Sequence, residues 1–371
     1  MNAQPKGWCP GAYRPMMSGD GLIVRVRPWM GRLSSAQLDA IAAISDQYGN
    51  GQIDVTNRAN VQVRGIHTKD HGAVLDALAQ ANLLDANSVL ESRRNVLISP
   101  IWQEGDLTCR LADELVRRLE ELPDLPAKFG FSIDVGPVRH LSAASADIRL
   151  ERAADGRLIV RADGLDAGRL VAEDEAIDRV MDLARWFSAR RDKQFRRMAL
   201  VLQSQQPEGT WQELTPTHEQ SEPQPELTEH GQIVGLPFGR LATKLISEIT
   251  LKCLGVRLTH NRMLLLEGIS GFGHDDAITQ KDDPLLRVDA CPGMPHCISA
   301  SIQTRTVARQ IATKVSGTLH VSGCEKGCAR KSAANTTIVG RDGLIDLIEN
   351  GTVQSTPKIK GLSPQQLLNE I

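Results

Sequence analysis

The chain has 371 residues, with 43 Lys and Arg against 45 Asp and Glu, and 4% of its residues are aromatic. A net charge of −2 and so few aromatic side chains exclude the basic, base-stacking surface that nucleic-acid binding requires. No apolar signal segment follows Met1, and no uncharged apolar run reaches the about eighteen residues that a membrane span needs. We therefore expect a cytoplasmic protein without nucleic-acid or membrane partners, and this length predicts about two or three domains.

The first unit is predicted to contain a strand, a helix, two strands and a second helix. Ser34 and Gln37 form a capping box, apolar residues then recur at helical spacing, and Tyr48 and Gly49 end the helix. The two strands that follow alternate apolar and polar residues, and the second helix is expected at 72–84. This order is that of a ferredoxin-like α+β unit.

Residues 91–202 are predicted to form an α/β region that does not repeat the first unit. Apolar patterning indicates a helix near 106–121 and a long helix over 174–203, with strands in the segments 128–136, 146–152 and 156–164. The stretch 203–230 is rich in Gln, Glu, Pro and Thr and lacks apolar periodicity. It is expected to be a linker.

The segments on the two sides of that stretch resemble each other. Residues 231–269 give a strand, GRL, a helix, a strand, a turn with Thr and Asn, a strand and GI, in the order seen at 21–66. A duplicated unit implies a pseudo-twofold pair with a pocket between its halves. We predict ferredoxin-like repeats at 1–90 and 231–285 and an α/β region at 286–371. That region is expected to have a helix at 298–315, a strand at 318–323 and a closing hairpin at 335–351.

Four of the seven cysteines form two close pairs, CPGMPHC and CEKGC, among glycines and prolines. Cytoplasmic thiols stay reduced, so clustered cysteines there more often bind metal or act in chemistry than form disulfides. Zinc knuckles use C-x2-4-C, for which C-x5-C is too wide, whereas an iron–sulfur cluster accepts the wider loop. A [4Fe–4S] cluster is predicted on Cys291, Cys297, Cys324 and Cys328. The other thiols are interpreted as packing or incidental: Cys9, Cys109 and Cys253.

Basic side chains gather in the predicted strands and turns of these motifs. Arg25 and Arg27 are two apart on a strand and are expected to share a face. Arg58 lies in a turn, where a guanidinium can bind a carboxylate through two hydrogen bonds. For Arg64 and Arg93 a solvent-facing role stays equally open. The gathering predicts a polyanionic ligand near the metal site. Its members are Arg25, Arg27, Arg58, Arg64, Arg93, Arg94, Lys128, Lys326, Arg330 and Lys331.

Several of these motifs resemble one superfamily in order along nearly the whole chain. VRVRPWMGRL, TNRANVQVRGI, SRRNVLISP, LPAKFGF, the C-x5-C pair and SGCEKGCAR are similar to the sirohaem-type nitrite and sulfite reductases. GWCPGAYRPMMSGDGLIVRVRP and ACPGMPHC resemble the precorrin-3B synthase family within it. The resemblance implies a nitrite/sulfite reductase-like fold and a monooxygenase of cobalamin (vitamin B12) biosynthesis. Its substrate would be a polycarboxylate, precorrin-3A, hydroxylated by dioxygen at C20 with lactone formation.

The resemblance also implies roles for single residues. The four paired cysteines match the cluster ligands, and Cys328 matches the cysteine that bridges to the sirohaem iron in the reductases. Arg25, Arg94 and Lys128 match cations that bind the small anion over the haem, and they are the predicted catalytic residues. Gly130 replaces a second lysine of the reductases. This departure weakens the case for nitrite or sulfite and predicts space for a larger substrate.

Arg58 matches a residue that holds carboxylates of the macrocycle. With Arg27 and Arg330 it makes up the predicted substrate-binding set. The synthase interpretation also implies an additional iron centre, either mononuclear non-haem iron or sirohaem, and an electron donor protein or NAD(P)H-linked reductase. A monomer is expected.

Two other functional classes stay open from the sequence. One is a ferredoxin-dependent nitrite or sulfite reductase with sirohaem, and the other is a tetrapyrrole or iron–sulfur carrier without catalysis. The histidines show no metal-binding triad pattern, so the ligands of a second iron are not identified and most histidines are interpreted as structural. These are His67, His140, His260, His274, His296 and His320.

Overall fold

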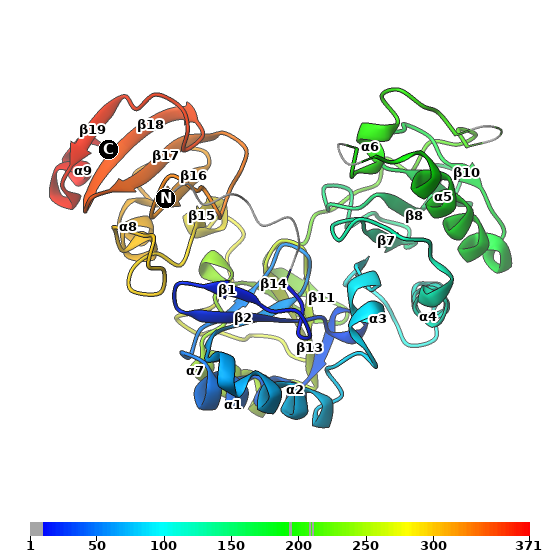
Figure 1. Ribbon diagram of the computed structural model, residues 1–371, viewed down its shortest axis with the longest axis horizontal. Coiled ribbons are helices and arrows are strands. Elements are labelled where there is room, and N and C mark those ends of the chain that lie inside the picture. Colours follow the sequence, from blue (N-terminus) through cyan, green and yellow to red (C-terminus); the bar gives the residue numbers. More distant parts are fainter. Residues whose placement is uncertain (1–9, 193–194, 208, 210) are drawn as a thin grey trace.

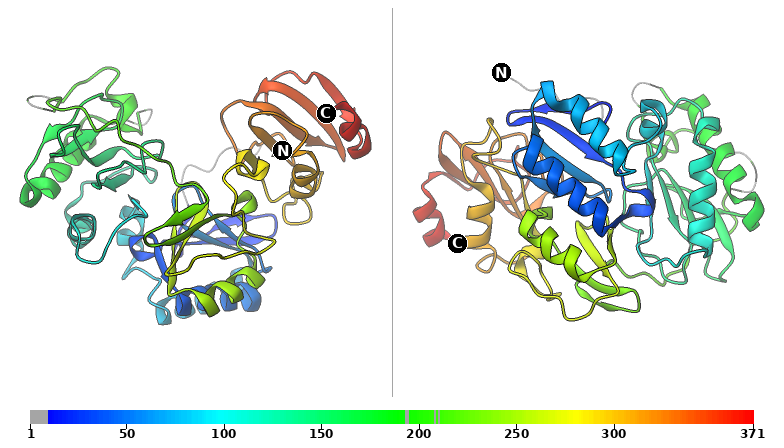
Figure 2. Two further views of the ribbon diagram at one scale, coloured as in Figure 1. Left: turned by 180° about the vertical axis from the view of Figure 1, so that it is seen from behind. Right: turned by 90° about the horizontal axis from the view of Figure 1, so that it is seen from below.

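The computed structural model describes residues 10–192, 195–207, 209 and 211–371, and these residues form three lobes (Figure 1). The central lobe holds the two repeats, with their helices on one face. The other two lobes stand on the opposite face, one at each end (Figure 1, Figure 2). This arrangement confirms the predicted α+β fold with duplicated ferredoxin-like units. No described helix is long and apolar enough to cross a membrane.

The first repeat forms an antiparallel sheet in the order β1-β2-β5-β4. The predicted capping box is present: Gln37 N donates to Ser34 Oγ over 3.2 Å, and Ser34 N donates to Gln37 Oε1 over 3.1 Å. The second helix is shorter than predicted, because Asn82 has a left-handed φ of 54° that ends it. The elements are β1 (Met16–Ser18), β2 (Gly21–Val26), β4 (Ile53–Val55), β5 (Val61–Ile66), α1 (Ser35–Tyr48), α2 (His71–Gln80) and α3 (Ser88–Arg93).

The second repeat contains a strand borrowed from the first. Its sheet has the order β11-β12-β14-β13-β3, and β3 begins within the GRL motif of the first repeat. In return, Leu241 N of the second GRL motif donates to Ile53 O of β4 over 2.9 Å. Helices α1 and α7 then pack against each other. The elements are β3 (Arg32–Ser34), β11 (Glu226–Thr228), β12 (Gly231–Gly235), β13 (Gly255–Leu258), β14 (Met263–Glu267) and α7 (Thr243–Lys252).

The two repeats match down to single backbone torsions. Thr56 Oγ1 accepts from Asn60 N over 3.2 Å, and Thr259 Oγ1 accepts from Met263 N over 3.1 Å, so the β4–β5 and β13–β14 turns are the same. Counting along these turns places Arg58 opposite Asn261 and Asn57 opposite His260. Positive φ values recur in pairs at Gly21 and Gly231, Met30 and Phe238, Gly31 and Gly239, Ala59 and Arg262, and Gly65 and Gly268.

The second lobe is a mixed five-stranded sheet, β10-β9-β8-β7-β6. The single helix predicted for 174–203 is wrong, because α5 ends at Arg190 and α6 begins at Met198. Before α6, the Arg197 side chain and Met198 N both bond to the buried carboxylate of Asp147, which requires a bend. The elements are β6 (Val96–Ile98), β7 (Phe131–Asp134), β8 (Ile148–Arg152), β9 (Leu158–Ala162), β10 (Arg169–Leu170), α4 (Leu107–Arg117), α5 (Ala176–Arg190) and α6 (Met198–Val201).

The third lobe repeats the topology of the second. In each sheet three parallel strands are followed by two antiparallel ones: β6-β7-β8 and then β9-β10, β15-β16-β17 and then β18-β19. Of the residues predicted to form a helix at 298–315, only those of α8 do so. The predicted closing hairpin is formed by β17 and β18, and β19 and α9 follow it. The elements are β15 (Val288–Ala290), β16 (Leu319–Ser322), β17 (Ala334–Arg341), β18 (Leu344–Gly351), β19 (Ile359–Leu362), α8 (Thr304–Ile311) and α9 (Pro364–Glu370).

The segment between the halves packs against the second lobe. Trp211 is buried, and Leu214 pairs with Gly168 while Gln220 pairs with Arg139 in isolated bridges. Single contacts of this kind do not recur at a fixed spacing along the chain, so apolar periodicity does not predict them.

Each repeat holds one outer lobe through a charged residue at the same position of its sheet. Asp54 of β4 accepts from Arg305 of α8 over 2.7 Å. Arg257 of β13 donates to Pro100 O over 2.9 Å and to Trp102 O over 2.6 Å, in the loop after β6. The acid therefore docks the third lobe, and the base docks the second.

A first prediction concerns Asp134 at the end of β7. Its Oδ2 accepts from His140 N and Leu141 N, while no described residue partners Oδ1, and burial raises its pKa to about 6. The folded state then holds this proton more tightly than the unfolded state. Stability from this group is complete below pH 4 and falls as pH rises to about 6, by about 1–3 kcal/mol. This fall should be visible as a loss of hydrogen-exchange protection at the β7 and β8 amides, and Asp134→Asn should remove it. The exposed Asp166→Asn, in the same lobe, should retain it.

Candidate functional site

The predicted cluster ligands extend from one edge of the third lobe. Cys291 follows β15 and Cys324 follows β16, two neighbouring parallel strands whose ends meet at the same edge. Cys291 N donates to Val321 O over 3.3 Å, and Gly323 N donates to Cys291 Sγ over 3.3 Å. A backbone N–H therefore already points at one of the sulfurs, as in iron–sulfur sites.

Two glycines let these loops approach so closely. Gly293 has a φ of 65°, and a side chain there would collide with Thr304. Gly323 leaves no room for a Cβ beside Ala300, whose own Cβ would be 2.5 Å away. Thr304 also donates through Oγ1 to Cys291 O over 2.5 Å. The two cysteine loops are thus packed on the start of α8.

The four thiols lie close enough to affect one another. Burial raises the pKa of Cys328, and the charges of Cys291, Cys324 and Cys297 raise it further. Burial also raises the pKa of Cys291. None of the four is in a disulfide. Thiols held in the protonated form must release protons when they bind a metal.

The sequence spacing of these cysteines favours a cluster over a single zinc ion. Among the described residues, no group of three or more Cys, His, Asp or Glu side chains converges on a point that could hold one metal ion. A zinc site needs its sulfurs about 2.3 Å from the metal, whereas a cluster holds its cysteines around a larger frame. The [4Fe–4S] assignment stays a prediction that these residues fit. Cys109 and Cys253 are buried with pKa raised to about 11 by burial, and Cys9 lies outside the described residues.

A cavity of about 410 Å³ adjoins the second cysteine loop. Its walls come from both repeat turns and from the third lobe, including Ala329, the neighbour of Cys328. Arg330, a predicted substrate-binding residue, lines this cavity. It donates to Asp289 Oδ2 over 3.0 Å, and Arg262 donates to Asp289 Oδ1 over 3.0 Å. Asp289, which the sequence did not single out, therefore fixes two cations at the wall.

Arg58 and Lys128 meet at the junction of the first repeat with the second lobe. Arg58 Nη2 donates to Lys128 O and to Ser145 Oγ, each over 3.1 Å. The open space expected at Gly130 is absent. A Cβ there would lie 2.8 Å from Asn95 Nδ2 and 3.4 Å from Arg58 Nη1. Gly130 is therefore explained by close packing around the Asn95 amide and not by a wider pocket.

Arg25 and Arg94 both lie close enough to Arg27 for their charges to lower its pKa, and Arg94 Nη2 donates to Arg27 O over 2.8 Å. Strand β2 ends at Val26, one residue before Arg27, and Arg25 Nη2 donates to Gln62 Oε1 over 2.6 Å. Arg27 instead turns to the Glu91 carbonyl and is buried, which lowers its pKa to about 10.

Arg94 is held by a carboxylate. Its Nε and Nη2 each donate to Asp85 over 2.8 Å. With Arg27 it lines a separate cavity of about 280 Å³ that shares no lining residue with the cavity beside Cys328. The sequence predicts both arginines at the substrate. Their partners, the Asp85 carboxylate for Arg94 and the Glu91 backbone carbonyl for Arg27, follow from tertiary packing alone.

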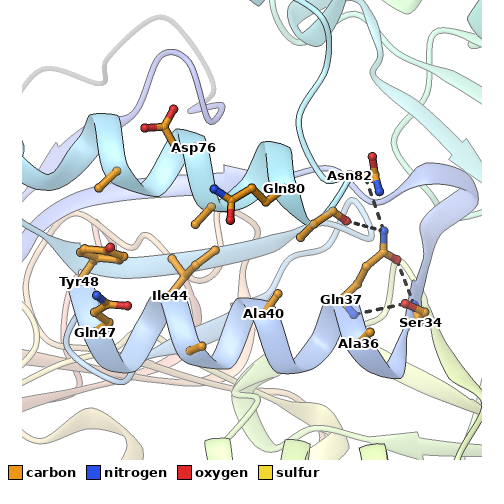
Figure 3. Close-up of a pocket in the computed structure, with 14 residues that line it drawn as sticks. Ser34, Ala36, Gln37, Ala40, Ile44, Gln47, Tyr48, Asp76, Gln80 and Asn82 are labelled. Carbon is orange, nitrogen blue, oxygen red and sulfur yellow. Dashed lines mark hydrogen bonds between the residues drawn. The ribbon is translucent and has the colours of Figure 1, made fainter.

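A larger groove on the opposite face has no such chemistry. It measures about 870 Å³ and runs between α1 and α2, lined mainly by alanines and amides (Figure 3). Gln37 spans one end, donating through Nε2 to Ala81 O over 3.2 Å. The cysteine loops lie on the other side of the repeat sheets (Figure 1). The candidate site is therefore the cysteine edge with its adjoining cavity.

Comparison with known proteins places this geometry among relatives. Residues 14–81 match the nitrite/sulfite reductase ferredoxin-like half domain. The chain is 27% identical to a precorrin-3B synthase of Sinorhizobium sp., over 95% of this chain and 84% of that one. It is 29% identical to a ferredoxin–nitrite reductase of Synechococcus elongatus, over 38% of this chain and 30% of that one. The NirA protein of Mycobacterium tuberculosis has the same fold, with a TM-score of 0.64, 17% identity, and 94% and 79% coverage.

A second prediction tests the ligand set. Cys291→Ser and Cys324→Ser should each lose most of the bound iron, because a hydroxyl is a poor replacement for a thiolate. Cys253→Ser is the matched control, since that thiol is also buried but lies on the helix face, after α7. Iron and sulfide content of anaerobically purified protein gives the answer. Equal losses in all three variants would contradict the four-cysteine assignment.

Proposed function

We propose, from the membership of this chain in the nitrite and sulfite reductase-like superfamily, that it is a precorrin-3B synthase. The reaction would be dioxygen-dependent hydroxylation of precorrin-3A at C20 with lactone formation, in cobalamin biosynthesis. One observation carries the proposal. Similarity to a precorrin-3B synthase extends over 95% of the chain, whereas similarity to a ferredoxin–nitrite reductase covers 38%.

The site suits an anionic macrocycle next to a redox group. The four cysteines would hold a [4Fe–4S] cluster, which supplies single electrons when bound. Arg330, oriented by Asp289, would bind a substrate carboxylate at the cavity wall, and Arg58 would bind another at the lobe junction. Of the predicted catalytic residues, Arg25 lies on strand β2 of the first repeat. The ligands of a further iron, mononuclear or sirohaem, are not identified among the described residues.

The proposed reaction defines the partners. One atom of dioxygen enters the product, and the other leaves as water after taking up two electrons and two protons. The electrons would come from a donor protein or an NAD(P)H-linked reductase. We propose that the protein acts as a cytoplasmic monomer.

The alternative is a ferredoxin-dependent nitrite or sulfite reductase with sirohaem. Partial matches to ferredoxin–nitrite reductases and to a sulfite reductase hemoprotein component favour it. Against it, Gly130 stands where the reductases have a second lysine. Fewer cations then remain for a small anion.

A third prediction decides between the two reactions. Purified protein with a reductant should convert precorrin-3A only when dioxygen is present, and label from ¹⁸O₂ should enter the product. The same protein should not reduce nitrite or sulfite with a strong artificial donor. Reduction of either anion at about 1 per second or faster, a typical enzymatic rate, would contradict the synthase proposal. So would hydroxylation without oxygen.

A fourth prediction tests Arg58. Arg58→Lys keeps the charge but loses the planar fork, which should weaken substrate binding by about 1.5–3 kcal/mol. Ser145→Ala is the control, because it removes a lobe contact of Arg58 and leaves the guanidinium in place. Unchanged affinity in Arg58→Lys, or equal losses in both variants, would show that Arg58 only joins the lobes.

A further inference from the structure

We propose that His260 and Glu222 form an acid–base pair for the ligand of the cavity beside Cys328. His260 is the catalytic residue, which takes a proton from an O–H or N–H group of the ligand and returns it. Glu222 is a positioning residue that acts through His260. The identity of the ligand as a polycarboxylate tetrapyrrole rests on the proposed function.

The pair has the geometry of a general base and its orienting acid. His260 is 6% exposed and lines the cavity together with Asn261, Arg262 and Arg330. Its Nε2 lies 2.6 Å from Glu222 Oε2. Its Nδ1 is itself buried and has no hydrogen-bond partner among the described residues. One ring nitrogen is therefore fixed by the protein, and the other is a buried acceptor without a protein partner, on a residue that lines the cavity.

The charge of Glu222 determines which nitrogen carries the proton. Burial opposes ionisation of Glu222, but hydrogen bonds from His260, Ala143 and Asn261, with the charge of His260, hold its pKa at about 2. An ionised carboxylate can only accept, so Nε2 carries a proton whether the imidazole is charged or neutral, and in the neutral form Nδ1 is the nitrogen without one. Nδ1 then presents a lone pair, as in an imidazole oriented by a carboxylate for base catalysis.

The fold does not require a histidine at this position. The identical turn in the first repeat has Asn57 where the second has His260, and both turns keep the same threonine hydrogen bond. Asn57 and His260 line the same cavity. The histidine is thus an addition to one of two equal turns, and the segment that joins the halves supplies a partner for it.

The surroundings suit proton transfer to and from an anion. Arg262 and Arg330, both fixed by Asp289, would hold carboxylates of the ligand beside the imidazole. When His260 accepts a proton, Glu222 compensates the charge of the imidazolium. The transfer needs no oxidant, because only a proton moves from ligand to Nδ1 and back.

The structure offers variants that separate chemistry from folding. His260→Asn copies the first repeat and should keep the turn intact. It should lower kcat with precorrin-3A by about 10²-fold or more, the usual contribution of a general base, with the substrate Kd little changed. Glu222→Gln should lower kcat less, and the double variant should be no slower than His260→Asn, because the two act as a unit. The pH profile of kcat/KM should lose its acid limb in His260→Asn.

Two control variants separate the acid–base role from the loss of any histidine or any lobe contact. His274→Asn changes a histidine whose Nε2 is 3.6 Å from Glu248 and which does not line the cavity, so it should leave kcat unchanged. Ser142→Ala removes a donor that ties Glu222 to the second lobe and should also be neutral. Full kcat in His260→Asn, or a change in KM alone, would overturn the proposal.

A further measurement does not depend on the reaction. Nitrogen NMR of the intact, histidine-labelled protein should show His260 as the Nε2–H tautomer, and Glu222→Gln should remove this preference. A resonance of the opposite tautomer would overturn the proposal whatever the substrate. If the wild type reduces nitrite but converts no precorrin-3A, the proposed function fails. The same variants then decide the acid–base role in nitrite reduction, which also consumes protons.

Discussion

The contribution of β3 from the first repeat to the sheet of the second is the constraint on which the rest of the structure depends. β3 of the first repeat completes the second sheet, and Leu241 of the second repeat bonds to Ile53 in the first. The second sheet is completed by a strand of the first repeat, and a backbone hydrogen bond ties β4 to the second repeat, so the turns after β4 and β13 are held relative to each other. Both turns line the cavity, and the third lobe supplies the rest of its walls.

The same pairing explains why the outer lobes stand where they do. Equivalent strands carry Asp54 and Arg257, and each binds a different lobe through its own charge. The third lobe supplies the Arg305 cation for Asp54, whereas the second lobe supplies the backbone carbonyls of Pro100 and Trp102 for Arg257. These contacts hold one lobe at each repeat, and residues of the third lobe complete the wall of the cavity.

Sequence patterns predicted the repeats and the paired cysteines because these depend on local signals. The capping box at Ser34 and the glycine-bounded cysteine loops are visible within a few residues. The partners of the basic residues were not predictable in this way. Asp289 sits in a short strand and Asp85 in a loop, and only the fold brings them to Arg330 and Arg94. Predictions of helix ends also failed where a tertiary hydrogen bond, such as that from Met198 N to Asp147, interrupts an apolar pattern.

The duplicated halves have divided their chemistry. At the strand end that carries Cys291 in the third lobe, the second lobe has Ser99, and both residues donate from their backbone N–H to the neighbouring strand. At the turn that carries His260 in the second repeat, the first has Asn57. The four paired cysteines and the His260 imidazole of the cavity are thus in the second half, while Arg58 in the first half has Asn261 as its counterpart. A symmetric fold supplies two equal frameworks, and function needs them to differ. On the proposed function, the residues that would carry the chemistry lie at positions where equal backbones carry unequal side chains.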